Sequence, residues 1–386
     1  MGLELTKRIK DNIIERRNRL FSNKVNSIPS PFIRFRDDFL GIEQKKEYLI
    51  SSFTKGGKTQ FTSFVFVFTP LFFAYNHRDQ IRVKFFFYLW EETKEDFTTR
   101  FICHLIYKLS NGKIEVSPTE IMSTDNNKPV RQEVLDIMNT EEFNSYMQFF
   151  EECSIFSDST NPTGIYMECK NYAENNGVTH TKPKKYKDEF GVERTTQSFD
   201  YYEANDKEEY KIIIIDHLSL VSTEKGMTLK QSMDKVGEYC IILRDRYNFT
   251  PVIIQQQNTD QESLDAIKMQ KLRPTVAGLA DSKYSARNCN VFLGLFSPMK
   301  FELKNYKGYD ITKLKDSIRF LEVILNRGGT AGGLIALYFN GKVCDYRELP
   351  NPDDKAGLQK WYDYIEHKNA KSFLIKIRKL IKINKT

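Results

Sequence analysis

The chain has 386 residues, of which 40% are hydrophobic and 13% aromatic, so it can bury one large core or two ordinary ones, and intrinsic disorder is excluded as its default state. Its net charge of +7, from 58 basic and 51 acidic residues, permits a polyanionic partner without requiring one. The six cysteines are scattered without a C-x-x-C pair, which argues against a zinc site and indicates reduced thiols in the cytoplasm.

Two membrane interpretations can be dismissed from the sequence. The N-terminal stretch 1–20 is too charged for a signal peptide, and its match to a myristoylation pattern is a short one of the kind that arises by chance. The apolar run 61–75 is shorter than the roughly 20 residues that a membrane helix needs, and Pro70 interrupts it. We therefore expect no membrane partner and a buried helix at 61–75.

Strand and helix patterns alternate through the first half of the chain. Buried strands are predicted at 47–53, 81–90 and 153–159, and helices at 61–75, 94–109 and 162–176, with a polar, helical stretch at 110–152. The charged segment 178–210 has few core residues, so we predict a surface insertion there, folded as a hairpin around Gly191.

The second half of the chain adds more strands than helices. A helix is predicted at 228–247, and strands at 211–221, 251–257, 290–296, 320–326 and 334–340. Asn340-Gly341 predicts a hairpin turn after the last of these strands, and residues 351–386 read as a basic helical tail. Alternating strands and helices predict an α/β fold with a mostly parallel sheet, helices on both faces and an antiparallel hairpin at one edge.

The stretch "SSFTKGGKTQ" at 51–60 nearly matches the phosphate-binding pattern G-x-x-x-x-G-K-[ST], except that Ser52 replaces the first glycine. Serine fits there if its backbone φ stays negative. The strand before the loop and the helix after it are the context that such a loop requires, and the alternative is a chance basic turn. The candidate nucleotide-binding residues are Ser52, Lys55, Gly56, Gly57, Lys58, Thr59 and Gln60.

Carboxylates follow two of the predicted strands. Asp216 ends the run "IIII", and ligands of open α/β sheets bind at this end of the strands, so we expect it to hold Mg²⁺ together with Thr59. Glu91 follows strand 81–90 and is our choice for the base that activates water, with Glu92 as the fallback. The alternative for each is a helix cap or a turn.

Two further polar groups stand at strand ends. "VIIQQQN" places three glutamines after strand 251–257, and Gln256 is our choice for a γ-phosphate sensor, with Gln255 and Gln257 as rivals. "NRGGTAGG" places Arg327 beside four glycines, where it could act as an arginine finger across a subunit interface. The alternatives are polar residues leaving a sheet and a surface arginine in a turn.

In this order, the motifs resemble the ATPase domain of the DnaB-type replicative helicases, a hexameric branch of the RecA-like P-loop NTPase fold. The resemblance runs from 39 to 349; "DHLSL" is similar to the family's D-Y-L-Q-L, and "NRGGTAGG" to its Q-R-N-G-P-T-G. It implies that residues 31–350 form the ATPase domain and that 1–30 hold a linker helix that docks on a neighbour. A phage-type variant without the family's N-terminal primase-binding domain fits this organisation.

The resemblance also implies an activity and partners. The activity is ATP-driven movement on single-stranded DNA, with ATP and Mg²⁺ as cofactors. The protein would form a hexameric ring with Arg327 acting in trans, and would have a primase or loader as a further partner, in the cytoplasm of a bacterial or phage-infected cell. Lys58 and Thr59 would bind phosphate and Mg²⁺, Glu91 would be the base and Gln256 the sensor. Candidate DNA contacts are Lys225, Lys230, Lys268, Lys271 and Arg273.

Two other functions remain open at this point. One is a RecA-like recombination or remodelling ATPase that unwinds no fork. The other is a non-catalytic DNA-binding scaffold with a degenerate loop, for which Ser52 and Leu325 speak, since the family often has a second basic finger at the latter position. The retention of Lys58, Thr59, Glu91 and Asp216 argues against the scaffold.

Overall fold

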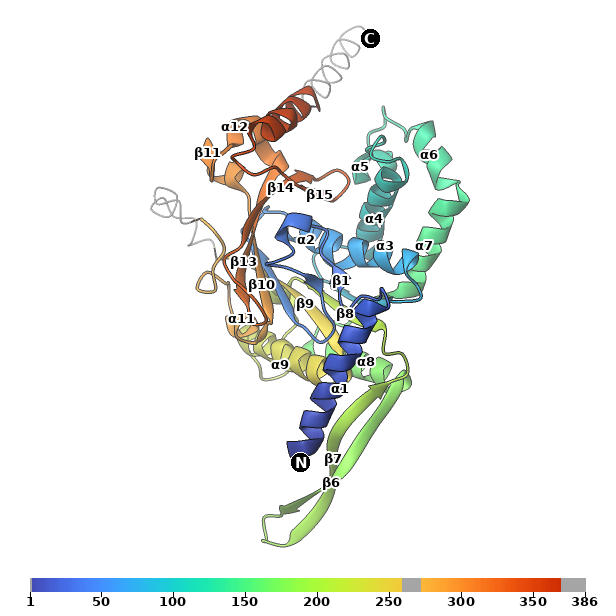
Figure 1. Cartoon of the computed structure of the whole chain (residues 1–386), viewed down its shortest axis with the longest axis vertical. Helices are drawn as coiled ribbons and strands as arrows, with labels where there is room; N and C mark the ends of the chain where they lie inside the picture. Colours follow the sequence, from blue (N-terminus) through green and yellow to red (C-terminus); the bar gives the residue numbers. More distant parts are fainter. Residues whose placement is uncertain (1, 259–271, 369–386) are drawn as a thin grey trace.

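The computed structural model describes residues 2–258 and 272–368 and is built around a nine-stranded sheet of order β15-β14-β13-β10-β3-β9-β8-β4-β5 (Figure 1). Six neighbouring strands, from β10 to β5, are parallel, and β13, β14 and β15 continue the sheet in antiparallel pairing. The predicted mostly parallel sheet with an antiparallel edge is therefore confirmed. The strands are β3 (Tyr48–Ser52), β4 (Arg82–Leu89), β5 (Ser154–Phe156), β8 (Glu209–Asp216), β9 (Phe249–Gln256), β10 (Val291–Phe296), β13 (Ile318–Asn326), β14 (Leu334–Asn340) and β15 (Asp345–Glu348).

Helices cover both faces of the parallel strands, as the apolar patterns predicted. Because side chains alternate along a strand, Phe85 and Phe87 of β4 belong to one core cluster while Phe86 and Tyr88 belong to the other. The first cluster packs against α2 (Lys58–Thr62), η2 (Ser63–Phe68), α3 (Thr69–Asn76), α4 (Lys94–Leu109) and α7 (Glu141–Cys153), and the second against α8 (Pro162–Asn175) and α9 (Leu229–Tyr247).

The apolar run after the phosphate loop forms one continuous helix from α2 to α3. Its middle, η2, is a π-helical segment, and all six of its residues are buried. Phe66 packs against Tyr48 of β3 with 5.1 Å between the ring centroids. The middle of this helix is buried because the sheet lies on one side and α4 and α7 lie on the other, which explains why η2 is almost entirely apolar.

The remaining elements are short or lie at the edges. A third core cluster joins β13 and β14 to a helical segment at 355–368, whose Trp361 ring lies 4.9 Å from that of Tyr338. The other elements are α1 (Gly2–Phe21), α5 (Pro118–Ile121), α6 (Gln132–Met138), α11 (Tyr284–Asn288), α12 (Ile311–Leu314), the pairs β1 (Ile28–Pro29) with β2 (Gly41–Ile42) and β11 (Asn305–Tyr306) with β12 (Tyr309–Asp310), and the hairpin β6 (Gly177–Lys187) with β7 (Glu193–Ala204).

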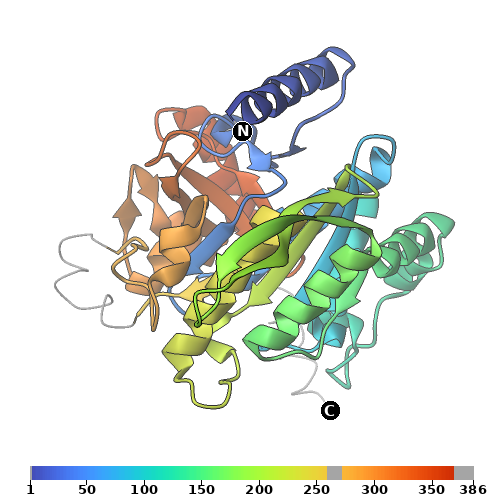
Figure 2. The same ribbon diagram turned by 90° about the horizontal axis from the view of Figure 1, so that it is seen from below.

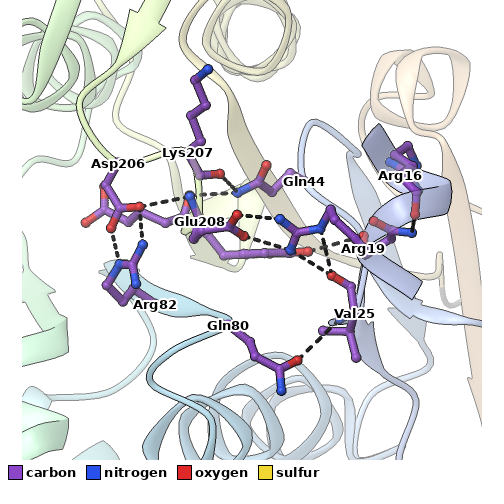
Figure 3. Close-up of polar contacts among 12 residues, drawn as sticks. Arg16, Arg19, Val25, Gln44, Gln80, Arg82, Asp206, Lys207 and Glu208 are labelled. Atoms are coloured by element: carbon purple, nitrogen blue, oxygen red, sulfur yellow. Dashed lines mark hydrogen bonds and ion pairs between the residues drawn. The ribbon is translucent and has the colours of Figure 1, made fainter. Parts of the chain in front are cut away.

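The C-terminal end of α1 is fixed to the lower end of the sheet by a polar network (Figure 3). Arg19 donates to the carbonyl of Val25 and to the carboxylate of Glu208, each at 2.8 Å. Beside it, Gln44 donates to the carbonyl of Lys207 at 3.0 Å. Figure 2, viewed from below, shows α1 and the β6–β7 hairpin as separate projections at this end of the molecule.

No helix in the described residues is both long and apolar enough to cross a membrane.

Replacing Phe66 by alanine should lower the free energy of unfolding by about 3–5 kcal/mol, because it leaves a cavity between η2 and the sheet. Urea denaturation of the purified protein measures this. The control is Phe190→Ala, which removes the same ring from a position that is 80% exposed and should change stability by less than about 0.5 kcal/mol. Equal losses in the two variants would contradict the assigned packing.

Candidate functional site

The phosphate-loop sequence lies between β3 and α2, as predicted. Ser52 is the last residue of β3 and is buried in extended backbone, so it needs no positive φ there. Gly57 has a φ of 94°, which favours glycine. At Gly56, a Cβ atom would lie 2.7 Å from the Ser52 hydroxyl oxygen and 2.9 Å from the carbonyl oxygen of Phe53. The serine is therefore accommodated because a glycine stands opposite it.

Two residues that the sequence did not single out hold this loop from the antiparallel strands. Arg319 of β13 donates from Nε to the carbonyl of Gly56 at 2.9 Å, and its guanidinium carbon lies 4.5 Å from the ring centroid of Phe339. Tyr346 of β15 donates to the carbonyl of Gly57 at 3.1 Å. Neither residue stands out in the sequence, because β13 holds other polar residues as well and β15 is a polar strand, so no motif identifies them as partners of the loop.

An open pocket of about 690 Å³ lies over the loop, at the carboxyl ends of β3, β9, β8 and β4. Ligands of open α/β sheets bind at this edge. The pocket brings together most of the predicted nucleotide-site residues and adds several that were not predicted. Its lining residues are Thr54, Lys55, Gly57, Lys58, Thr59, Gln60, Glu91, Glu92, Arg100, Asp216, Gln256, Asp316, Arg319, Phe339 and Gly341.

Asp216 ends β8 beneath the loop and is almost completely buried. Burial raises the pKa of its carboxyl group to about 6, although the Thr59 side chain and the Lys58 charge oppose this shift. Its Oδ1 atom is buried and accepts no hydrogen bond within the described residues. A bound divalent cation would give this oxygen a partner, so the position fits the predicted Mg²⁺ role.

The described residues contain no group of three or more His, Cys, Asp or Glu side chains able to hold a metal ion. A cation beside Asp216 and Thr59 would therefore need further oxygen ligands from outside the protein. Phosphate groups and water are the usual source of these ligands for Mg²⁺.

The geometry separates the two glutamates after β4. One oxygen of Glu91 lies 4.0 Å from Nζ of Lys58 and 3.9 Å from Nε2 of His217, and half of its side chain is exposed to the pocket opening. Glu92 instead accepts a hydrogen bond of 3.0 Å from Arg100. Glu91 is thus the glutamate left open to the pocket, which favours it over Glu92 as the base.

The three glutamines also have different surroundings. Gln255 is buried and donates to the carbonyls of Ala280 and Ser282. Gln257 is buried as well and donates to the Ser51 hydroxyl at 2.9 Å and to the carbonyl of Thr275 at 3.2 Å. Gln256 alone lines the pocket, where its amide donates to the hydroxyl of Thr54 in the phosphate loop.

Arg327 lies at the opposite end of the sheet from the pocket. The preceding residue Asn326 pairs with Val291, which pairs with Tyr48 at the start of β3, whereas the loop follows the end of β3. The Arg327 guanidinium donates from Nε to the carbonyl of Cys289 at 2.9 Å. Arg327 therefore does not reach the pocket of its own chain, and the predicted finger role is geometrically open only in trans.

The three candidate DNA contacts within the described residues are exposed side chains. Lys225 and Lys230 are exposed, and the latter forms an ion pair of 2.8 Å with Asp234. Arg273 is exposed and forms an ion pair of 2.6 Å with Glu322 of β13. Lys268 and Lys271 lie outside the described residues.

Gln257 and Gln256 make different contacts, so replacing each by alanine should have a different effect on stability. Gln257→Ala should lower the free energy of unfolding by about 1–3 kcal/mol, because it leaves buried groups of Ser51 and Thr275 without partners. Gln256→Ala should change stability by less than about 0.5 kcal/mol. Urea denaturation of both variants measures this, and similar losses would contradict the distinction.

Asp216→Asn should stabilise the metal-free protein at pH 7.5. The folded pKa of about 6 lies above the ordinary value of 3.8, so the wild type loses stability as the pH rises between those values and stays penalised above them. The variant lacks this penalty, which amounts to about 3 kcal/mol. Urea denaturation in EDTA from pH 3.5 to 8 measures the difference, which should vanish near pH 3.5; a pH-independent difference would contradict the assignment.

Two solved structures share this fold. The first, an ATPase domain, matches with a TM-score of 0.57 and 12% identity over 89% of this chain and 99% of that chain. The second, a DnaB-like replicative helicase studied with its interactions with primase, matches with a TM-score of 0.57 and 11% identity over 88% of this chain and 66% of that chain. No protein-family model and no curated protein matches the sequence. At these identities the likeness establishes the fold alone, which this chain shares with that ATPase domain and with that DnaB-like replicative helicase.

Proposed function

We propose that the protein is an ATP-dependent replicative DNA helicase, a ring-forming motor that moves on single-stranded DNA and unwinds duplex. One observation carries the proposal: five residues chosen from four separate sequence motifs line a single pocket, at the edge of the sheet where α/β proteins bind nucleotides. They are Lys58, Thr59, Glu91, Asp216 and Gln256. A chance basic turn would not gather these partners.

Lys58, Thr59 and Asp216 would hold the phosphates and Mg²⁺ of ATP. Lys58 begins α2, so its ammonium group and the amide groups of the glycine loop face the same space. Thr59 and Asp216 lie together beneath that space and provide one hydroxyl and one carboxylate for the ion. When bound, Mg²⁺ would neutralise charge that develops on the phosphates.

Glu91 would orient and deprotonate the attacking water. Its carboxylate is close enough to Lys58 and His217 to be held over the pocket but is bonded tightly to neither. Gln256 would sense the γ-phosphate. Its side chain contacts the phosphate loop, and its backbone carbonyl accepts a hydrogen bond of 3.0 Å from the backbone amide of Ala280. A movement of the phosphate loop would therefore be transmitted to the segment after β9.

Two features support assembly into a ring, for which a hexamer is our proposal. Arg327 lies too far from its own pocket to act there, so a finger role needs a neighbouring subunit. The helix α1 is exposed along nearly all of its described side chains and presents Ile9, Ile13 and Leu20, each more than half exposed. A neighbouring subunit would cover them, with 1–30 acting as the linker.

The segments proposed to contact single-stranded DNA follow β8 and β9, whose ends form the pocket. Lys225 and Lys230 belong to the first segment, and Arg273 to the second. Hydrolysis in the pocket could therefore move both segments directly. A primase or a loader would be a further partner.

The first test is ATP hydrolysis with and without single-stranded DNA, for the wild type and for Glu91→Gln. We expect DNA to stimulate hydrolysis by the wild type, and the substitution to lower the rate at least about 100-fold while ATP still binds, because general-base catalysis contributes 10²–10⁴-fold. Glu92→Gln is the matched control and should retain more activity.

The outcomes separate the candidate functions. Stimulated hydrolysis without unwinding of a forked duplex would favour a RecA-like remodelling ATPase. No hydrolysis by the folded wild type, with or without DNA, would overturn the motor assignment and favour the non-catalytic scaffold.

A further inference from the structure

The β6–β7 hairpin projects from the body of the molecule at the end opposite the pocket (Figures 1 and 2). Residues 181–197 are exposed on both faces of the ribbon, apart from a half-buried Asp188 at the turn. The seven residues 181–187 of β6 extend it by roughly 23 Å. Two-stranded hairpins are marginally stable in water by themselves, so a long free ribbon suggests an element that a partner covers.

Only the base of the hairpin is anchored to the protein. Tyr202 donates to the carbonyl of Ala173 in α8 at 2.9 Å, and the ring of Phe199 lies 6.1 Å from that of Tyr247 in α9. These contacts fix the direction in which the ribbon leaves the body. The residues beyond them are free to meet another molecule.

The pairing register gives the free ribbon one face without carboxylates. Lys182 pairs with Ser198, Lys184 with Thr196, and Tyr186 with Arg194, and paired residues point to the same side of a ribbon. We name these six residues the basic face: Lys182, Lys184, Tyr186, Arg194, Thr196 and Ser198. The opposite face carries Pro183, Lys185, Lys187, Glu193, Thr195 and Gln197.

The carboxylates near the basic face lie at its two ends. Lys182 forms an ion pair of 2.7 Å with Asp200 at the base, and Arg194 one of 2.6 Å with Asp188 at the turn. Asp188 also accepts the amides of Phe190 and Val192, each at 3.0 Å, so its charge helps to fold the turn. Lys184, in the middle of the face, forms no ion pair among the described residues.

We propose that the β6–β7 hairpin is a binding arm for double-stranded DNA, and that its basic face lies against the phosphates of the major groove. That groove admits a two-stranded ribbon, and lysine, arginine and hydroxyl groups are the usual phosphate contacts. Binders of single strands stack successive bases on several aromatic side chains, and the basic face has only Tyr186. The deep, narrow major groove of RNA duplexes excludes a ribbon of this kind.

Charge favours DNA over a second copy of the chain. The protein carries a net charge of +7, so long-range repulsion between copies opposes self-association, whereas a polyanion is attracted. At the tip, Phe190 is 80% exposed and Val192 is 55% exposed, and a partner that the ribbon meets would cover them.

The test compares two variants with the same loss of charge on opposite faces of one strand, Lys182→Gln/Lys184→Gln and Lys185→Gln/Lys187→Gln. The full chain is titrated, without nucleotide, into a fluorescently labelled 30-base-pair duplex over a salt series, and anisotropy is measured. The basic-face variant should bind about tenfold more weakly at low salt, with a salt slope reduced by about two. The opposite-face variant should lose less than about threefold. All four lysines are exposed, and circular dichroism checks that both variants fold.

Each result decides the proposal. A selective loss in the basic-face variant, with binding to a single strand of equal length unchanged, supports it. Equal losses, no loss in either variant, or a wild type that does not bind duplex would overturn it. Sedimentation velocity of Phe190→Ser identifies the rival: a smaller assembly with unchanged duplex binding would assign the arm to a second copy. Because no nucleotide is present, the result is independent of the proposed hydrolysis.

Discussion

The parallel pairing of β3, β9, β8 and β4 is the constraint on which the candidate site depends. Pairing in register sets Ser52 beside Gln256 and Leu89 beside Asp216, so four chain segments end at one edge of the sheet. Three connections join these four strands, and each contains helices that help to bury the strands on both faces. The aromatic core is thus the reason that polar groups from distant motifs meet in one pocket.

The polar groups at that edge differ in how deeply they are buried and in which partners they bond. Asp216 lies beneath the loop, with a raised pKa and a free oxygen, whereas Glu91 is half exposed two residues beyond β4. Gln255 and Gln257 are bonded to the surrounding backbone, and only Gln256, between them, faces the pocket. Because side chains alternate along a strand, Gln255 and Gln257 point to one side and bond within the protein, whereas Gln256 points to the other side and lines the pocket.

The sequence predicted the features that depend on local patterns. The helix at 94–109, the hairpin around Gly191 and the carboxylate at the end of "IIII" follow from short motifs, and the structure has all three. Arg319 and Tyr346 were not predicted as neighbours of the phosphate loop, because their contacts join segments more than 260 residues apart. The choice among the three glutamines likewise required the pairing of β9 with its neighbours, since spacing alone treats them as near equivalents.

The strand β13 links two places that no single motif connects. Arg319 near its first residue holds a carbonyl of the phosphate loop, and Arg327 directly follows its last residue. The strand spans roughly 27 Å, pairs with β10 along most of its length and pairs with β14 over its first five residues, which makes it stiffer than a loop. In the ring that we propose, a shift of the loop in one subunit would displace the arginine that this subunit offers to the next, and would so provide a mechanical route for ordering their turnovers.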